Sequence, residues 1–548
     1  MLRLHLLHAL AAATVILCPD MYTPFAAGIT RQWTNDFGDN SWYEDNNWSP
    51  IGIPPVDDTV ILPSSSLADA GGAGITTDHG GSITANQSHI VCVDFTVGDN
   101  GQGTLDLNSG SSVTNENSYI GRNLGIGLAT IRGAAWKNLG SMYVGGDDVA
   151  AGGTGTLTVD QGGLLEVDGT LKVWGPGDTV NLADDTSAIL CESFYNFSTF
   201  SHTDGTLTID GGRFQPALAV GVGTEYVITG GSTGENPTLI LTGGARLGDT
   251  AAEVPNTIFI GNSGTRGTIN VLDGAYLLSG GPIRIGHSGT RGDLLVNDAT
   301  VEVGGMLEVG TRPGDGYLTI ETGALVDGNA VQVGSTHYPG SGTITVTGGL
   351  FDINAVDILD SGTVNLQGGQ ISAFSITLQD SGSSFNFTGG RLSVGTFDGD
   401  LNNQGGTVAP GGSPGLTQVV GDYTQAPSGT LEIELYGTET TPSLQFDRLS
   451  AETLNLAGTL KVELGGGFVP EEGNSFAILD WVSTISGSFG VYDLPELTGL
   501  EWDRTDLYNT GIISVVAGST VVPEPASIFM FALVATGILA FARRKRRK

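Results

Sequence analysis

Short segments in which apolar and polar residues alternate recur through most of the chain. In Gly-Thr-Leu-Thr-Val at Gly155 to Val159, Leu157 and Val159 would face one side and the threonines the other. Segments of the same kind stand at Gly103 to Leu107, Gly205 to Ile209, Gly267 to Val271, Gly316 to Ile320, Gly342 to Val346 and Gly362 to Leu366. No window between the two ends keeps a 3.6-residue apolar period, so the pattern predicts short strands and no long helix there.

A second signal, a β-branched residue followed by glycine, recurs with a period of about 24 residues, which is the length of one repeat in a stacked architecture. One such repeat is too small to bury its own apolar face, whereas stacked repeats share a continuous core. We therefore expect a parallel β-helix. The gap from Val144 to Val220 is close to three periods, and we expect an irregular insertion within it from Asp184 to His202. The pairs are Val97-Gly98, Ile120-Gly121, Val144-Gly145, Val220-Gly221, Ile260-Gly261, Ile285-Gly286, Val309-Gly310 and Val333-Gly334.

The segments on either side of the repeats have a different composition. Residues 28–94 contain Trp33, Trp42 and Trp48, which indicate either a cap over the open end of a β-helix or a surface on which sugars stack. Residues 95–410 hold the repeats. Residues 411–516 contain longer strands, for which we expect a closing module of antiparallel β-strands, and residues 517–522 form a linker.

The repeats from about residue 95 to residue 395 resemble the autotransporter-associated β-strand repeats of bacterial surface passengers. The tryptophan-containing start of the chain is similar to the beginning of such proteins. Gly421 to Asp447 and Gly499 to Trp502 resemble their terminal module. The resemblance implies an all-β chain: a parallel β-helix with an N-terminal cap and a C-terminal antiparallel β module.

Both ends carry export signals. Arg3 and the apolar stretch Ala9 to Leu17 predict a signal peptide over residues 1–27, read by the Sec machinery and cleaved near Ala26 or Ala27. At the other end, the uncharged stretch from Ala526 to Ala542 is long enough to cross a thin bilayer as a helix. Six cations follow, which would keep the end of this membrane helix on the cytoplasmic side: Arg543, Arg544, Lys545, Arg546, Arg547 and Lys548.

The motif before that helix reads Val522, Pro523, Glu524 and Pro525. Together with the short span and the arginine cluster, it resembles the PEP-CTERM sorting signal of Gram-negative bacteria, here residues 523–548. The resemblance implies an exosortase partner, a membrane cysteine transpeptidase that cuts near the motif. It also implies membrane anchoring for at least part of the protein's life, followed by release to the cell envelope, outer surface or matrix.

The chain is strongly acidic, with 22 Lys and Arg against 58 Asp and Glu. Without the signal peptide and the tail, 15 basic and 56 acidic residues remain, a net charge of −41. Such a surface repels nucleic acid and excludes it as a partner. It attracts cations, so the sequence predicts no dedicated cofactor and leaves weak Ca²⁺ binding as an alternative.

Residues with the spacing of a catalytic or metal site are not evident. The histidines of the body, His79, His89, His202, His287 and His337, match no zinc spacing, so no metal site is predicted. The acidic pairs Asp57-Asp58, Asp147-Asp148 and Asp184-Asp185 would act together only in loops, as turn residues, calcium ligands or an acid–base pair. Cys92 and Cys191 would remain in the exported protein as one disulfide or two thiols, and their spacing decides neither.

Arginine recurs at one position of the repeat, in Gly264-Thr265-Arg266, Gly289-Thr290-Arg291 and Gly310-Thr311-Arg312. Because both intervals approximate one coil, Arg266, Arg291 and Arg312 would stack along one edge. A line of guanidinium groups would suit an acidic exopolysaccharide. Alternatively, Asp293 and Asp315 neutralise them.

These features favour an exported, non-enzymatic structural or adhesin-like protein of the envelope or biofilm matrix. One alternative is a lyase or hydrolase of acidic polysaccharide, built on the same fold. Another is an ice- or mineral-binding face of threonines, made of Thr156, Thr158, Thr206, Thr208, Thr319, Thr343 and Thr345.

Overall fold

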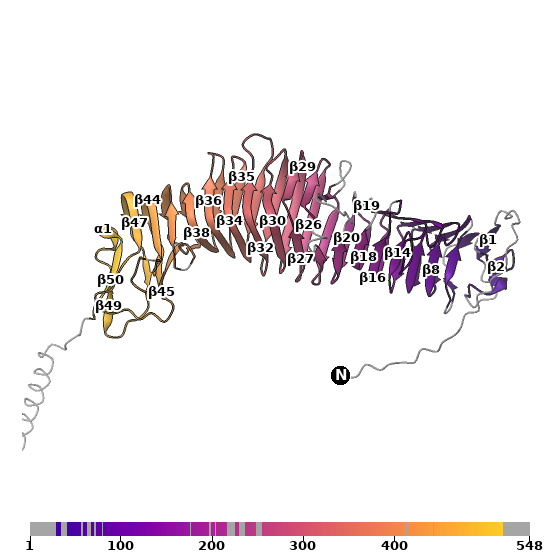
Figure 1. The fold of residues 1–548 in the computed structure, drawn as a ribbon, viewed down its shortest axis with the longest axis horizontal. Coiled ribbons are helices and arrows are strands. Elements are labelled where there is room, and N and C mark those ends of the chain that lie inside the picture. The colour runs from indigo at the N-terminus through magenta and orange to yellow at the C-terminus, as the bar shows by residue number, and fades with distance from the viewer. Residues whose placement is uncertain are drawn as a thin grey trace, which may run out of the picture.

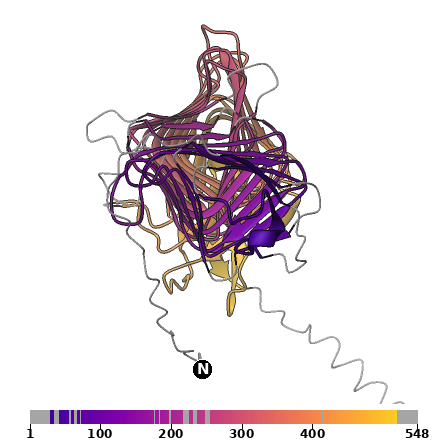
Figure 2. The same cartoon turned by 90° about the vertical axis from the view of Figure 1, so that its right-hand side faces the viewer.

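The computed structural model is a rod of stacked β-coils that runs from the N-terminal strands to the C-terminal ones (Figure 1). It describes residues 29–518 except 34–40, 56–57, 63–66, 71–72, 79, 176, 183, 197–198, 203, 216–224, 230–235, 248–254, 413 and 442. In the view turned by 90°, the strands wind round a common interior, with the N-terminal coils towards the reader (Figure 2). The predicted parallel β-helix is confirmed, because nearly all the strand pairs are parallel.

Three ladders of strands, A, B and C, form the walls of the rod, and some long strands bend from one ladder into the next. Ladder A comprises β1 (Thr30–Trp33), β3 (Thr59–Leu62), β6 (Gly81–Asn86), β9 (Gln102–Asn108), β12 (Ile126–Arg132), β15 (Thr154–Asp160), β17 (Thr179–Leu182) and β19 (Thr199–His202). It resumes with β22 (Glu225–Ile228), β25 (Thr257–Asn262), β28 (Ile283–His287), β30 (Thr300–Val309), β32 (Leu325–Val333), β34 (Leu350–Ile358), β36 (Gln370–Leu378), β38 (Arg391–Asp398), β41 (Leu416–Val419), β44 (Arg448–Leu456) and β47 (Leu479–Gly487).

Ladder B is continuous along the rod and ends in the second halves of β44 and β47. Its other strands are β4 (Leu67–Asp69), β7 (His89–Val91), β10 (Ser112–Asn115), β13 (Ala135–Asn138), β16 (Leu164–Val173), β18 (Ala188–Asn196), β20 (Thr206–Asp210), β23 (Thr238–Thr242), β26 (Arg266–Leu272), β29 (Thr290–Asn297), β31 (Gly314–Ile320), β33 (Gly342–Val346), β35 (Gly362–Leu366), β37 (Ser384–Phe387), β39 (Leu401–Asn403) and β42 (Asp422–Gln425). At about 4.8 Å per strand, this ladder makes the rod about 80 Å long.

Ladder C uses the second halves of β16 and β18 and the first halves of β30, β32, β34, β36 and β38. Its own strands are β5 (Ile75–Thr77), β8 (Asp94–Val97), β11 (Asn117–Ile120), β14 (Met142–Val144), β21 (Arg213–Gln215), β24 (Arg246–Leu247), β27 (Tyr276–Ser279), β40 (Thr407–Val408), β43 (Thr430–Leu435), β45 (Thr459–Leu464) and β48 (Val491–Asp493).

The register of the paired strands agrees with the predicted repeat length, but it contradicts the expected insertion from Asp184 to His202. Successive partners in ladder B are Val113, Trp136, Leu165, Ile189 and Leu207, so the step along the chain varies around that length from coil to coil. The segment from Asp184 to His202 is therefore not an irregular insertion. It contributes β18 and β19, which pair in parallel with the coils beside them.

Close stacking at one corner explains the two glycines in each repeat. Gly286, the next-to-last residue of β28, has φ +71°, and a Cβ built on it would lie within 3.0 Å of the Asp315 carbonyl oxygen of the next coil. A Cβ on Gly316 would lie within 3.0 Å of the Ile285 carbonyl oxygen. Each glycine thus makes room for the backbone beside the other. Leucine, isoleucine and valine side chains fill the interior between these corners.

The Gly-Thr strands do not keep to one face. β9 and β15 belong to ladder A, whereas β20, β26, β31, β33 and β35 belong to ladder B. Consequently Thr156 and Thr158 lie on a different wall from Thr206, Thr208, Thr319, Thr343 and Thr345. The expectation that all seven threonines share one face is therefore wrong, because they lie on two walls of the rod.

The parallel coils also extend further in both directions than predicted. β3 to β7, within the expected cap, already form parallel coils, and β41 to β45 continue the coils at the other end. The other N-terminal elements are β2 (Trp48–Ser49) and the short 3₁₀ helix at Asp45–Asn47. The antiparallel part at the C-terminus is one three-stranded sheet of β46 (Ser475–Ala477), β50 (Ile512–Ala517) and β49 (Leu500–Asp503), beside the one-turn helix α1 (Leu507–Thr510). Across the part of the chain that is described, no helix has the length and apolar character to span a membrane. The predicted tail helix lies outside that part.

Candidate functional site

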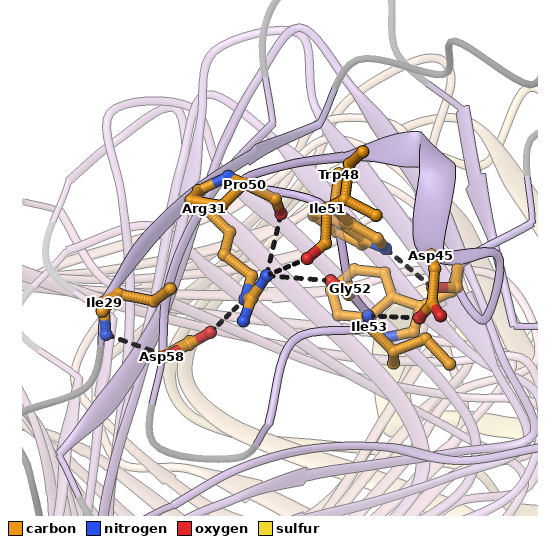
Figure 3. Close-up of polar contacts among 10 residues, drawn as sticks. Ile29, Arg31, Asp45, Trp48, Pro50, Ile51, Gly52, Ile53 and Asp58 are labelled. Carbon is orange, nitrogen blue, oxygen red and sulfur yellow. Dashed lines mark hydrogen bonds and ion pairs between the residues drawn. The ribbon is translucent and has the colours of Figure 1, made fainter.

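A charged network holds the N-terminal cap together (Figure 3). The Arg31 guanidinium forms an ion pair with Asp58 and donates to the carbonyl oxygens of Pro50, Ile51 and Gly52 at 2.8, 3.2 and 3.2 Å. The other Asp58 oxygen accepts the Ile29 amide at 2.8 Å. One buried ion pair therefore ties β1 to the turn that follows β2.

Two of the three tryptophans complete this cap. Trp42 and Trp48 are 4% and 1% exposed, with ring centroids 4.7 Å apart in an edge-to-face arrangement. The Trp48 indole N–H donates to the Trp42 carbonyl oxygen at 2.9 Å. Because their faces are covered, they form part of a cap and not an open surface for sugars. The side chain of Trp33 lies outside the described ones.

A cavity of about 270 Å³ lies between this cap and the first coils. Val60, Ile75 and Ile83 form an apolar part of its wall, together with Trp42. Asp58 and Thr77 add polar groups, and Tyr43 beside them donates its hydroxyl to the Gly74 carbonyl oxygen at 2.5 Å. The sequence did not indicate a cavity here, because its walls come from segments as far apart in the chain as Trp42 and Ile83.

The arginine ladder is only partly formed. Arg266 and Arg291 are register partners on β26 and β29, as predicted. Asp293 binds both, at 2.8 Å from Arg266 Nε and 2.7 Å from Arg291 Nη2, and Arg291 also lies 4.2 Å from the Tyr317 ring centroid. The next register partner of Arg291 is Asp315.

Arg312 is not part of this ladder. It lies in the turn between β30 and β31. Burial lowers the pKa of the His287 imidazole, and the positive charge of Arg312 lowers it further. The prediction of three stacked arginines is therefore wrong at Arg312.

Asp147 and Asp184, one member of each of two acidic pairs, accept hydrogen bonds within turns. Asp147 accepts the amides of Ala150 and Val149 at 3.0 Å each, which lowers its pKa, and it lies 3.7 Å from Arg122. Burial alone would raise the pKa of Asp184, but hydrogen bonds from Ser187 and Thr186 lower it overall. Asp57 lies outside the described residues, and its neighbour Asp58 belongs to the cap.

Buried aspartates that clamp one coil to the next were missed by the sequence reasoning. Asp78 accepts the amides of Asn100 and Gly101, and Asp178 accepts those of Gly155 and Gly175. Asp447 accepts Gly415 N–H at 2.7 Å and Glu434 N–H at 2.9 Å. Burial raises the pKa of Asp178, and it raises that of Asp447 to about 7. Some of the acidic residues of this chain therefore serve to hold neighbouring coils together.

Glu432, Glu434 and Glu463 form the one carboxylate cluster with metal-site spacing among the described residues. Two cations already contact it. Arg391 and Lys461 bind Glu432, the latter at 2.9 Å, and Lys461 also pairs with Glu463. The arrangement is that of an ion-pair network on ladder C.

The two cysteines are too far apart to form a disulfide with each other. Cys191 stands in register with Val167, Asn138 and Asn115, the last of which lies one coil beyond Cys92. Four coil steps of about 4.8 Å exceed the Cα separation of about 4.4–6.8 Å that a disulfide requires. Both residues are buried, and burial raises the pKa of the Cys191 thiol.

Residues 521–547 match the PEP-CTERM protein-sorting motif. The match confirms the sorting signal predicted around Val522, Pro523, Glu524 and Pro525. Such a motif implies export, membrane-associated sorting and processing by an exosortase-type enzyme. No curated protein matches the chain.

Proposed function

We propose that this chain is a non-enzymatic structural or adhesin-like protein of the bacterial cell envelope or extracellular matrix. The observation that carries the proposal is the position of the sorting motif. It follows β50 by only a few residues, at one end of a stack of parallel coils in which ladder B is continuous. A rigid rod with a sorting signal at its base is suited to extend from an envelope.

The charged groups of the rod support a structural role. Asp147 and Asp184 are engaged in turns, and Asp293 is shared by two arginines. A pair of carboxylates acting as acid and base needs instead one group held protonated and one ionised on either side of a substrate.

Extracellular polysaccharide is the partner that we propose. Arg266 and Arg291, whose side chains are 39% and 46% exposed, offer adjacent guanidinium groups to an acidic glycan. Asp293 partly neutralises the positive charge of the two guanidinium groups but leaves both side chains exposed to solvent.

Incubation with acidic and neutral polysaccharides, with and without Ca²⁺, tests the proposal. The measured quantities are retention of the protein and release of reducing or unsaturated sugar ends. We expect retention without product. Release of product would overturn the non-enzymatic role, and failure to be retained by any polysaccharide would remove the proposed partner.

A further inference from the structure

We propose that one corner of the rod binds an uncharged polysaccharide chain that lies along the rod. The corner is formed where β32, β34, β36 and β38 bend from ladder C into ladder A, and these strands stand side by side in the C-terminal half of the molecule (Figure 1). The inference rests on the proposed function, because it names a surface and a ligand class through which the rod would hold polysaccharide.

An open aromatic ring stands at this corner. Phe374, on β36, is 75% exposed, whereas the other phenylalanines with described side chains are buried or half-buried. Gly395 of β38 stands opposite Phe374 on the next coil, because the residues on either side of the two are register partners. A Cβ built on Gly395 would lie 3.8 Å from Cδ2 of the ring. The absence of a side chain at Gly395 therefore leaves the ring uncovered from that coil.

Two exposed asparagines continue the same column on the preceding coils. Asn354 of β34 stands between Phe374 and Asn329 of β32, with its neighbours in register on both sides. Its Nδ2 donates to Asn329 Oδ1 at 2.9 Å, and both side chains are exposed. Because an amide has two N–H donors and one carbonyl acceptor, this single bond leaves each asparagine able to bind a ligand.

The column offers both kinds of contact that a sugar makes. The C–H groups on one face of a pyranose pack against an aromatic ring, whose own face carries negative charge density. Side-chain amides donate to and accept from sugar hydroxyls. One exposed phenylalanine alone would need no explanation. An open ring in line with two amides, however, matches a ligand that is apolar on one face and carries hydroxyls around its edge.

The spacing of the column suits a polymer. From Asn329 to Gly395 there are three coil steps, or about 14 Å at roughly 4.8 Å per step. One coil step is close to the length of one sugar unit in an extended glycan. One unit would therefore stack on Phe374, while the units before it would lie beside Asn354 and Asn329.

The charges beside the column favour an uncharged glycan. Asp327 and Asp352 are exposed register partners, each two residues before one of the asparagines. No cation in the described part of the chain forms an ion pair with either, and the whole chain has a net charge of −36. An anionic sugar such as a uronate would be repelled here. This corner and the Arg266–Arg291 pair would thus hold different glycans.

Retention of the full-length chain on immobilised dextran, starch, mannan and galactan tests this corner, with alginate as the acidic polysaccharide. The chain is held in an amine-oxide detergent, because alkyl glycoside detergents carry sugars that would compete. At least one of the neutral polysaccharides should retain the chain.

Phe374→Ala should weaken that retention about three- to tenfold, the range of one aromatic contact. The melting temperature should not change, because the side chain is exposed. Phe374→Trp keeps a ring face and should bind at least as well as the wild type. Asn354→Ala should also weaken retention, by the effect of about one hydrogen bond. Leu124→Ala is the matched control, since Leu124 is 83% exposed in the turn between β11 and β12, near the other end of the rod.

Equal retention of the wild type and Phe374→Ala, or the same loss in Leu124→Ala, would overturn the site. Retention on alginate alone would also overturn it, but would leave the proposed function standing. Retention on a neutral polysaccharide that depends on Phe374, and not on Arg266 and Arg291, would establish the site. Failure to be retained by any polysaccharide would overturn the site and the proposed partner together.

Discussion

Gly286 and Gly316 allow two coils to stack closely at one corner. A side chain on either one would meet the backbone of the neighbouring coil, and backbone cannot move aside without breaking the ladder. The glycines that the sequence shows after each β-branched residue are therefore packing residues at a corner. Their recurrence was visible in the sequence, but the reciprocal contact was not, because it joins residues of two coils.

Gly316→Ala should destabilise the rod by about 1–3 kcal/mol, the usual cost of overpacking. The effect would be purely steric, because Gly316 does not have a positive φ. Gly490→Ala is the control, since its Cβ would meet nothing closer than the Gly458 oxygen at 3.7 Å. Urea unfolding of the two variants checks this. Equal stabilities would contradict the corner contact.

The buried carboxyl of Asp447 should make stability depend on pH. Burial raises its pKa from 3.8 to about 7, so the folded protein keeps a proton that the unfolded chain has already lost between those values. The free energy of unfolding should therefore fall by up to a few kcal/mol as pH rises through this window.

Asp447→Asn removes the titrating group and should flatten the dependence of stability on pH. It should also lower stability at every pH, because the asparagine NH₂ group would face one of the two backbone N–H donors that now bind Asp447. Urea unfolding between pH 4 and pH 8 compares the slopes. If the variant kept the slope of the wild type, Asp447 would not be its source.

At the scale of strands, the repeat length was predictable and its irregularities were not. Counting one period along the chain from Arg266 leads to Arg291, and the two are register partners. The next register step leads from Arg291 to Asp315 and not to Arg312. The turns between strands differ in length from coil to coil, so counting a fixed period along the sequence does not locate the register partner in each coil.

The polysaccharide-binding role of the arginines is therefore testable with an internal control. Replacing Arg266 and Arg291 together by Gln should weaken retention on acidic polysaccharide a few-fold, more at low salt, because exposed charges are screened. Arg312→Gln alone should have little effect. Retention assays at two ionic strengths measure this. The same loss in the Arg312 variant would indicate general charge attraction instead of a contact at β26 and β29.

At the scale of the whole molecule, the fold class followed from alternation and repeat length, whereas the limits of the coil stack did not. β3 and β6 have irregular spacing and lack the Val-Gly pairs, yet they pair as coils because their apolar residues Val60 and Ile83 meet in the same interior. The cavity was likewise invisible in the sequence, because it exists only where the cap meets the first coils. The sorting motif, by contrast, is a local signal and could be read directly.

The proposed role requires that the tail deliver the rod to the envelope or matrix. The most direct test expresses the full-length chain in a bacterium that has an exosortase, alongside a variant with Pro523→Ala and Pro525→Ala. Cell fractionation and intact mass are measured for both. We expect the wild type to lose its C-terminal tail and to appear in the envelope or matrix, while the variant keeps its tail and stays with the membrane. Wild-type protein that remains in the cytoplasm, or that is processed no differently from the variant, would contradict it.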